Sequence, residues 1–241
     1  MRRAPIGGLD LTVYLKAVPL LLRNPSIVVV PLLMAVAGVL IGMTFSPSGA
    51  VGVVTSGLAG LIVTLLELFG LAVACVIADD AWRHGRASFD RGGAEAQRRA
   101  GDILYAALGV TFILSIAQFT ATLIGPFALI LMAAAALFLI WAIPAAALGG
   151  IPGAASIQMS IERVRANPLP AVIVTVVTVG LVFFLPTLVA SWITLQLQLY
   201  TGSSLIIGSL ITALIQAIAT GYVALVLSKT YTDSSLGGRR W

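Results

Sequence analysis

The stretch "GLIVTLLELFGLAVACVIADD" (Gly60–Asp80) decides the fold class, because it is apolar for long enough to cross a bilayer and yet contains a carboxylate. A transmembrane helix needs about 20 mostly apolar residues. Glu67 is the only charged residue between Gly60 and Ala78. An intramembrane carboxylate is costly and usually faces the interior of a bundle. The stretch therefore predicts a spanning helix with Glu67 turned toward other helices.

The composition of the whole chain is that of a membrane protein. Of its 241 residues, 59% are hydrophobic and 10% are charged, and the mean hydropathy is +1.07. Soluble domains carry roughly 25% charged residues. We therefore expect a single transmembrane domain over residues 1–241. Cys75 is the only cysteine, so no internal disulfide can form. The first long apolar run begins only after Arg23, which argues against a cleavable signal.

Six apolar runs are each long enough to cross a bilayer as a helix. They are continuous and lack the alternating polarity of β-barrel strands. The sequence therefore predicts an all-α, polytopic bundle of six transmembrane helices. The predicted spans are Pro25–Phe45, Val51–Ala78, Ile103–Ile124, Phe127–Gly149, Pro170–Leu199 and Leu205–Ser228.

The basic residues predict the orientation of the bundle. All fourteen lysines and arginines fall in the N-terminal segment, the loops after the second and fourth spans, and the C-terminal tail. The other connections carry no charge. By the positive-inside rule both termini are cytoplasmic, and the Arg-, Ala- and Gly-rich composition suggests the inner membrane of a bacterium. We expect the following residues at the lipid headgroups: Arg23, Trp82, Arg83, Arg86, Arg98, Arg99, Arg163 and Arg165.

Membrane lipids are the expected partners. A basic cytoplasmic face on a chain of net charge +5 attracts anionic headgroups, although the same charges are explained if they only fix the topology. A homo-oligomer or another membrane protein stays open as a partner, and no nucleic-acid partner is expected.

Two similar segments, Leu21–Leu33 and Arg163–Val177, suggest a repeated unit. In each, an arginine is followed by Asn-Pro and a span, with Asn as the expected N-cap and Pro in the first turn. A looser version has Asp102 as the cap. An amphipathic stretch precedes each, and we expect these stretches, residues 9–22, 88–99 and 154–164, to be interfacial helices.

The simplest organisation is three helix-hairpin units, residues 9–78, 88–149 and 154–228. Each unit begins and ends on the same side of the membrane, so the repeats are parallel. Inverted repeats mark many secondary transporters, and the pattern therefore argues mildly against that class.

Polar residues recur on one face of several spans. Small residues around Glu67 allow neighbouring helices to approach closely. Two readings of Glu67 stay open: it is protonated and donates a hydrogen bond to Gln118, Gln216 or a backbone carbonyl, or it lines a wet cavity and binds a cation, a proton or a polar substrate. The residues of this intramembrane polar site are Glu67, Thr64, Gln118, Ser115, Thr194, Gln216 and Thr212.

The sequence offers no catalytic set. Phosphate-binding loops, nucleophile elbows and paired metal-ligand motifs are absent. Asp79, Asp80 and His84 could imitate a metal-dependent phosphodiesterase cluster, but no further ligands accompany them. Asp79 and Arg83 are four residues apart and can pair on a helix. We expect no catalytic residue, no metal and no cofactor.

Two stretches resemble a known pattern: "LKAVPLLLRNPSIVVVPLL" (Leu15–Leu33) and "WAIPAAALGGIPGAASIQMSIERVRANPLPAVIVTVV" (Trp141–Val177). They resemble uncharacterised bacterial six-span membrane proteins and are similar to the membrane domain N-terminal to some glycerophosphodiester phosphodiesterases. The resemblance implies six helices with both termini inside and amphipathic linkers, and no biochemical activity. The matching positions are Pro144, Gly149 or Gly150, Gly153, Ala155, Ser160, Arg163 and Arg165.

These observations favour a non-enzymatic membrane protein that acts as a scaffold, an accessory subunit or a lipid-organising module. The alternative is a small transporter or channel with Glu67 in its polar interior.

Overall fold

The computed structural model describes residues 10–44, 49–201 and 205–237. Every regular element within these residues is a helix, and six helical segments are long and apolar enough to cross a membrane. The predicted all-α bundle of six spans is confirmed.

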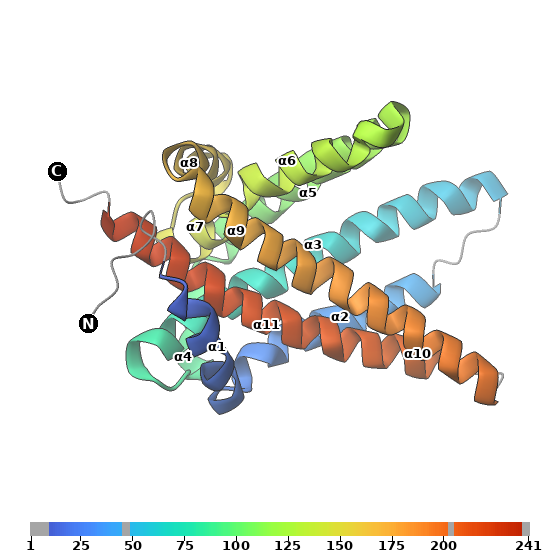
Figure 1. Cartoon of the computed structure of the whole chain (residues 1–241), viewed down its shortest axis with the longest axis horizontal. Coiled ribbons are helices and arrows are strands. Elements are labelled where there is room, and N and C mark those ends of the chain that lie inside the picture. Colours follow the sequence, from blue (N-terminus) through green and yellow to red (C-terminus); the bar gives the residue numbers. More distant parts are fainter. Residues whose placement is uncertain (1–9, 45–48, 202–204, 238–241) are drawn as a thin grey trace.

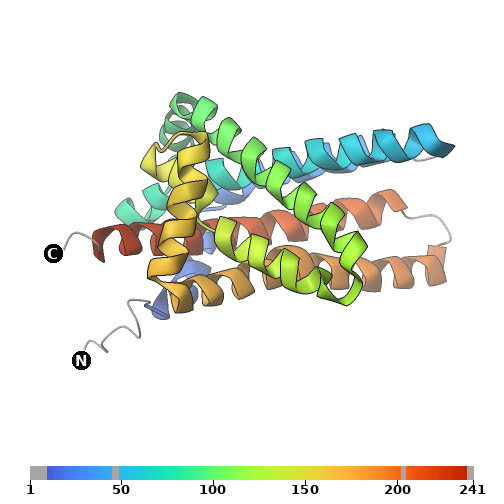
Figure 2. The same ribbon diagram turned by 90° about the horizontal axis from the view of Figure 1, so that it is seen from above.

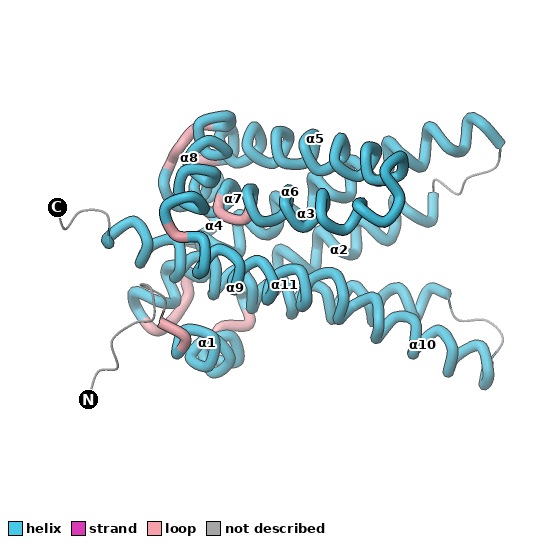
Figure 3. The backbone as a smooth tube through the Cα atoms, turned by 45° about the horizontal axis from the view of Figure 1, so that its top comes forward, coloured by secondary structure: helices cyan, strands magenta, loops and turns pink. Residues whose placement is uncertain are grey.

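The elements follow a simple order along the chain (Figure 1). Short helices α1, α4 and α8 each precede longer helical segments, and they lie together at one end of the bundle (Figure 3). The bounds are α1 Thr12–Arg23, α2 Ser26–Thr44, α3 Gly49–His84, α4 Phe89–Arg98, α5 Ala100–Ile124, η1 Gly125–Phe127, α6 Ala128–Leu139, α7 Ala142–Gly149, α8 Gly153–Ala166, α9 Pro168–Val179, η2 Gly180–Phe184, α10 Leu185–Thr201 and α11 Leu205–Gly237.

Helices α3 and α11 are the long central members of the bundle. Helix α2 packs against both of them, α10 packs against α11, and the hairpin of α5 and α6 joins through α3 and α8. The buried core gathers toward the end that holds the short helices, where small side chains let the helices approach closely. Toward the opposite end the helices diverge (Figure 1, Figure 2), and many large apolar side chains there are exposed, as lipid contact requires.

The fourth span is broken, although the sequence predicts one continuous helix. Helix α6 ends at Leu139 and α7 begins at Ala142. Pro144 explains the break, because it lacks an N–H and its ring conflicts with the carbonyl four residues earlier, at Ile140. The buried hydroxyl of Ser160, in α8, satisfies the interrupted backbone: it accepts from Trp141 N at 3.1 Å and donates to Phe138 O at 2.7 Å.

The fifth span also departs from a continuous α-helix. A π-helical turn, Gly180–Phe184, separates α9 from α10. Pro186 lies two residues beyond this turn and removes the N–H that would bond to Val182. Proline and π-turns are common causes of irregular helices.

The helix starts differ from the predicted caps. Pro168 is the first residue of α9, as predicted, but the Asn167 side chain makes no capping bond. Asp102 lies within the first turn of α5, and Arg99 occupies the position before the helix. Asn24 ends α1, and its side chain bonds elsewhere. Asn167 therefore occupies the predicted N-cap position without a capping bond, whereas the predictions that Asp102 and the Asn24 side chain act as caps are wrong. The division into three repeated units stays a prediction.

Ser160→Ala should destabilise the protein, because it leaves the buried Trp141 N–H without a partner. An unsatisfied buried polar group costs about 1–3 kcal/mol. Thermal unfolding in detergent measures the change. Ser191→Ala is the matched control, since the exposed Ser191 hydroxyl donates to the Thr187 carbonyl of its own helix. Equal melting temperatures for the two variants would contradict the role of Ser160.

Candidate functional site

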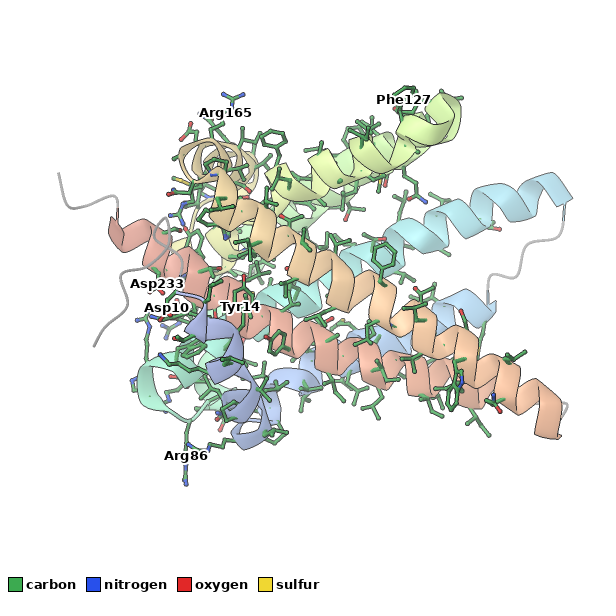
Figure 4. The ribbon with its side chains drawn as sticks, viewed as in Figure 1. Asp10, Tyr14, Arg86, Phe127, Arg165 and Asp233 are labelled. Atoms are coloured by element: carbon green, nitrogen blue, oxygen red, sulfur yellow. The ribbon has the colours of Figure 1, made fainter. Side chains whose placement is uncertain are left out.

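The basic side chains gather at one end of the molecule. They lie on α1, α4, α8, the adjoining turns and the ends of α3 and α11, at the end of the bundle where α11 finishes (Figure 1). Arg86 and Arg165 point outward on opposite sides of this end (Figure 4). Four further arginines, Arg2, Arg3, Arg239 and Arg240, fall outside the described residues. The described members are Lys16, Arg23, Arg83, Arg86, Arg91, Arg98, Arg99, Arg163, Arg165 and Lys229.

Arg99 is one of the predicted headgroup residues, and it binds inside the protein. Its guanidinium pairs with Glu95 at 2.6 Å and donates to the carbonyls of Ala147 at 3.0 Å and Leu148 at 2.6 Å. Those carbonyls belong to the last turn of α7, which ends at Gly149 and is followed by Gly150 in the left-handed conformation. The last carbonyls of a helix lack intrahelical partners and attract a positive charge. Arg99 therefore caps α7.

Arg163 and Trp82 also make interhelical contacts. The Arg163 guanidinium lies 4.0 Å from the centre of the Tyr231 ring and donates to Tyr231 O and Ser234 Oγ, both at 3.0 Å. Burial lowers the pKa of Arg163. The half-buried Trp82 indole donates to Leu225 O at 2.9 Å. These bonds join α8 and α3 to α11. The sequence predicted Arg163 and Trp82 at the lipid headgroups because they lie beside spans, and it did not predict these contacts between helices.

Among the remaining predicted headgroup arginines, some are paired and some are free. Arg83 pairs with Asp79 at 2.7 Å, which confirms the predicted pair, and Arg98 lies 3.6 Å from Glu95. Arg23, Arg86 and Arg165 are exposed and make no ion pair within the part of the chain that the structure describes. Their charges are available to an external anion.

Helix α1 carries apolar side chains on two faces. Val13 and Ala17 are buried, and the helix packs against α11. A second set recurs every three or four residues and so lies on one face. Its side chains are uncovered by the protein: Leu15 and Leu22 are each 78% exposed, and Leu11 and Val18 about half exposed at 48% and 49%. We call these four residues the α1 stripe.

Tyr14 fixes α1 against α11. Its carbonyl accepts a hydrogen bond of 2.9 Å from the Tyr222 hydroxyl. Its own hydroxyl is buried, and burial raises the pKa of Tyr14 to about 12. The helix is therefore held in place along its buried face while the α1 stripe faces outward.

Asn24 joins the end of α1 to the turn between α3 and α4. The side chain is 4% exposed. Its amide nitrogen donates to Leu20 O at 2.8 Å and to Gly85 O at 3.5 Å, and its oxygen accepts from Ala87 N at 2.7 Å. Sequence reasoning missed this role because the partners are more than sixty positions away along the chain.

The two carboxylates and the histidine at the end of α3 bond to neighbouring residues. Asp80 Oδ1 lies 2.8 Å from His84 Nδ1, and Oδ2 accepts from Ser88 N at 2.8 Å. Asp79 is engaged by Arg83. No group of three or more histidine, cysteine or acidic residues suited to a metal ion occurs within residues 10–44, 49–201 and 205–237.

Within the membrane, the structure brings Glu67 together with Gln216. Gln216 Nε2 donates to Glu67 Oε1 at 2.8 Å, which links α3 to α11, and both residues are half-buried. Gln216 is one of the partners considered for Glu67 from the sequence. The direction of the bond differs: the Glu67 carboxyl accepts it, whereas the sequence analysis considered a protonated carboxyl that donates.

The other predicted polar residues do not converge on Glu67 by any described hydrogen bond. Three of them donate their hydroxyls to carbonyls four positions earlier in their own helices: Thr64 to Gly60, Ser115 to Thr111 and Thr212 to Gly208. Gln118 is exposed. Thr194 lies in α10, but its side chain falls outside the described residues.

The six spans make the chain a multi-pass membrane protein. Comparisons with models of protein families, with curated proteins and with solved structures found no match. The resemblance to membrane domains of glycerophosphodiester phosphodiesterases therefore stays a prediction from the sequence.

Proposed function

We propose that the protein is a non-enzymatic, lipid-organising module of a bacterial inner membrane, with both termini in the cytoplasm. The observation that carries this proposal is the α1 stripe, an uncovered apolar face at the basic end of the bundle. The concentration of basic side chains at that end supports its cytoplasmic location through the positive-inside rule.

The energetics favour acyl chains as the cover of the α1 stripe. Burying one leucine side chain contributes about 1.5–3 kcal/mol relative to leaving it in water. The stripe leads along the chain into α2, where Val29 and Leu33 are also exposed as lipid-facing residues. A helix with an apolar face and adjoining basic residues lies in the headgroup region of a bilayer. Lys16 and Arg23 supply such charges on α1.

Placed in this way, α1 displaces headgroups and orders the acyl chains beneath it. Helices α4 and α8 lie at the same end of the bundle and carry further arginines. The proposed activity is the local arrangement of lipids around the bundle and involves no chemical turnover. The pairing of Asp79 with Arg83 and of Asp80 with His84 supports a structural role for the residues that could imitate a catalytic cluster.

Replacing Leu15 and Leu22 with Asn should reduce the number of lipids that each chain restrains. Spin-labelled lipids in reconstituted vesicles report this number by electron paramagnetic resonance. The matched control is Ala155→Asn with Gln158→Asn, which alters exposed positions of α8 at the same end of the bundle. We expect fewer restrained lipids in the α1 variant and an unchanged number in the control. No difference between the two would count against lipid organisation by α1.

A second candidate function is transport, and the Glu67–Gln216 pair favours it. The pair supplies a half-buried carboxylate and an amide within the spans, which is the chemistry of an intramembrane proton or cation site.

Glu67→Gln distinguishes transport from lipid organisation, because glutamine keeps the size of the side chain and cannot ionise. Proton and monovalent-cation flux into liposomes is the measurement, with empty liposomes as the control. We expect no flux above the control from either protein. Flux through the wild-type protein that disappears in Glu67→Gln would establish transport instead.

A further inference from the structure

The buried Asn24 side chain joins two segments that each carry an exposed arginine. Arg23 directly precedes Asn24 at the end of α1. Arg86 lies between the two residues of the α3–α4 turn that the Asn24 side chain holds, Gly85 through its carbonyl and Ala87 through its N–H. Residues far apart in the sequence thus become neighbours, and their backbone positions are fixed by the same side chain.

Both arginines are free to bind an external anion. Arg23 and Arg86 are exposed and form no ion pair with any described residue. The basic residues on either side of the turn differ: Arg83, in α3, is paired with Asp79 at 2.7 Å, and Arg91, in α4, lies 4.0 Å from Asp80. The two carboxylates at the end of α3 thus engage Arg83, His84 and Arg91, and Arg86 makes no described ion pair.

An exposed apolar side chain adjoins one of the two arginines. Leu22, beside Arg23, is 78% exposed and is the last member of the α1 stripe. Arg86 points away from the body of the protein at the same end of the bundle (Figure 4). Arginine binds phosphate through charge-assisted hydrogen bonds and can do so with two donors at once. The neighbouring apolar stripe would contact the acyl chains of the same lipid.

We propose that Arg23 and Arg86 form a binding site for the phosphate of an anionic lipid headgroup, positioned by Asn24. This inference rests on the proposed function, since it requires α1 to lie in the headgroup region. It adds a preference for anionic lipid and assigns it to two arginines contributed by α1 and the α3–α4 turn.

The test is native mass spectrometry of the full chain in detergent, titrated with phosphatidylglycerol or with phosphatidylcholine. A basic residue near a membrane surface contributes about 1 kcal/mol toward anionic lipid, so Arg23→Gln with Arg86→Gln should weaken phosphatidylglycerol binding by roughly 25-fold. Arg98→Gln with Arg165→Gln removes the same net charge from exposed positions and should leave the tightest phosphatidylglycerol site intact. An equal loss in both double variants would show a diffuse charge effect and overturn the site.

Inorganic phosphate identifies the source of the anion. We expect millimolar inorganic phosphate to leave phosphatidylglycerol bound, because the free ion makes no acyl-chain contacts. Complete displacement by inorganic phosphate at a concentration similar to that of the lipid would assign the two arginines to a soluble phosphate and overturn the lipid assignment.

The role of Asn24 is tested separately by Asn24→Ala, with Ser160→Ala as a variant that loses buried hydrogen bonds elsewhere. Both variants should melt at lower temperatures, but only Asn24→Ala should lose the preference for phosphatidylglycerol over phosphatidylcholine. Retention of the preference in a folded Asn24→Ala protein would contradict positioning by Asn24.

The failure of this inference and the failure of the proposed function are distinguishable. If Arg23→Gln with Arg86→Gln keeps the phosphatidylglycerol preference while Leu15→Asn with Leu22→Asn still lowers the number of restrained lipids, the arginine site is wrong and lipid organisation stands. If the leucine variant restrains as many lipids as wild type, the proposed function fails. The arginine site then also lacks support, because it requires α1 to lie in the headgroup region.

Discussion

The hydrogen bonds of the buried Asn24 side chain hold the basic end of the molecule together. The side chain bonds at once to the last turn of α1 and to both sides of Arg86 in the α3–α4 turn. Helix α1 also packs on α11 and is joined to it by the Tyr222–Tyr14 hydrogen bond. The amide therefore fixes the direction of the α1 stripe relative to the spans. A buried amide with its partners satisfied rigidifies its surroundings, and here it joins the helix that carries the α1 stripe to the turn that carries Arg86.

Other side chains at this end also bond to the backbone of a different helix. Ser160 completes the break before α7, Arg99 caps the carbonyls where α7 ends, and Arg163 binds the carbonyl of Tyr231 in α11. Each side chain comes from a different segment than the backbone it satisfies, so the bonds also tie the helices together. Away from this end the helices diverge and present large apolar side chains. At the basic end, hydrogen bonds between helices join the bundle. At the opposite end, the helices expose apolar side chains to lipid.

The fold class could be predicted from the sequence because it depends on the length of apolar runs, which is a local property. The breaks in the fourth and fifth spans have local causes in Pro144 and Pro186, but the sequence reading treated those runs as continuous. The roles of Asn24, Arg99 and Arg163 could not be predicted, since their partners lie far along the chain and nothing in the local pattern marks them. Asn24 resembles a helix cap from its neighbours alone. The small residues around Glu67 indicated that its side chain faces another helix. The structure shows Glu67 in contact with Gln216, one of the partners considered from the sequence.

The claim that α1 lies in the headgroup region with its stripe in lipid is tested most directly by the depth of a spin label at Leu15→Cys. The native Cys75 is fully buried, at 0% exposure, so the label reacts with the introduced cysteine. The same label at Gln158→Cys, on the exposed polar face of α8, is the control. We expect the label at residue 15 to collide readily with oxygen dissolved in the bilayer and poorly with a water-soluble nickel complex, and the label at residue 158 to do the reverse. A label at residue 15 that is as accessible to the nickel complex as the control would contradict the placement of the α1 stripe in lipid.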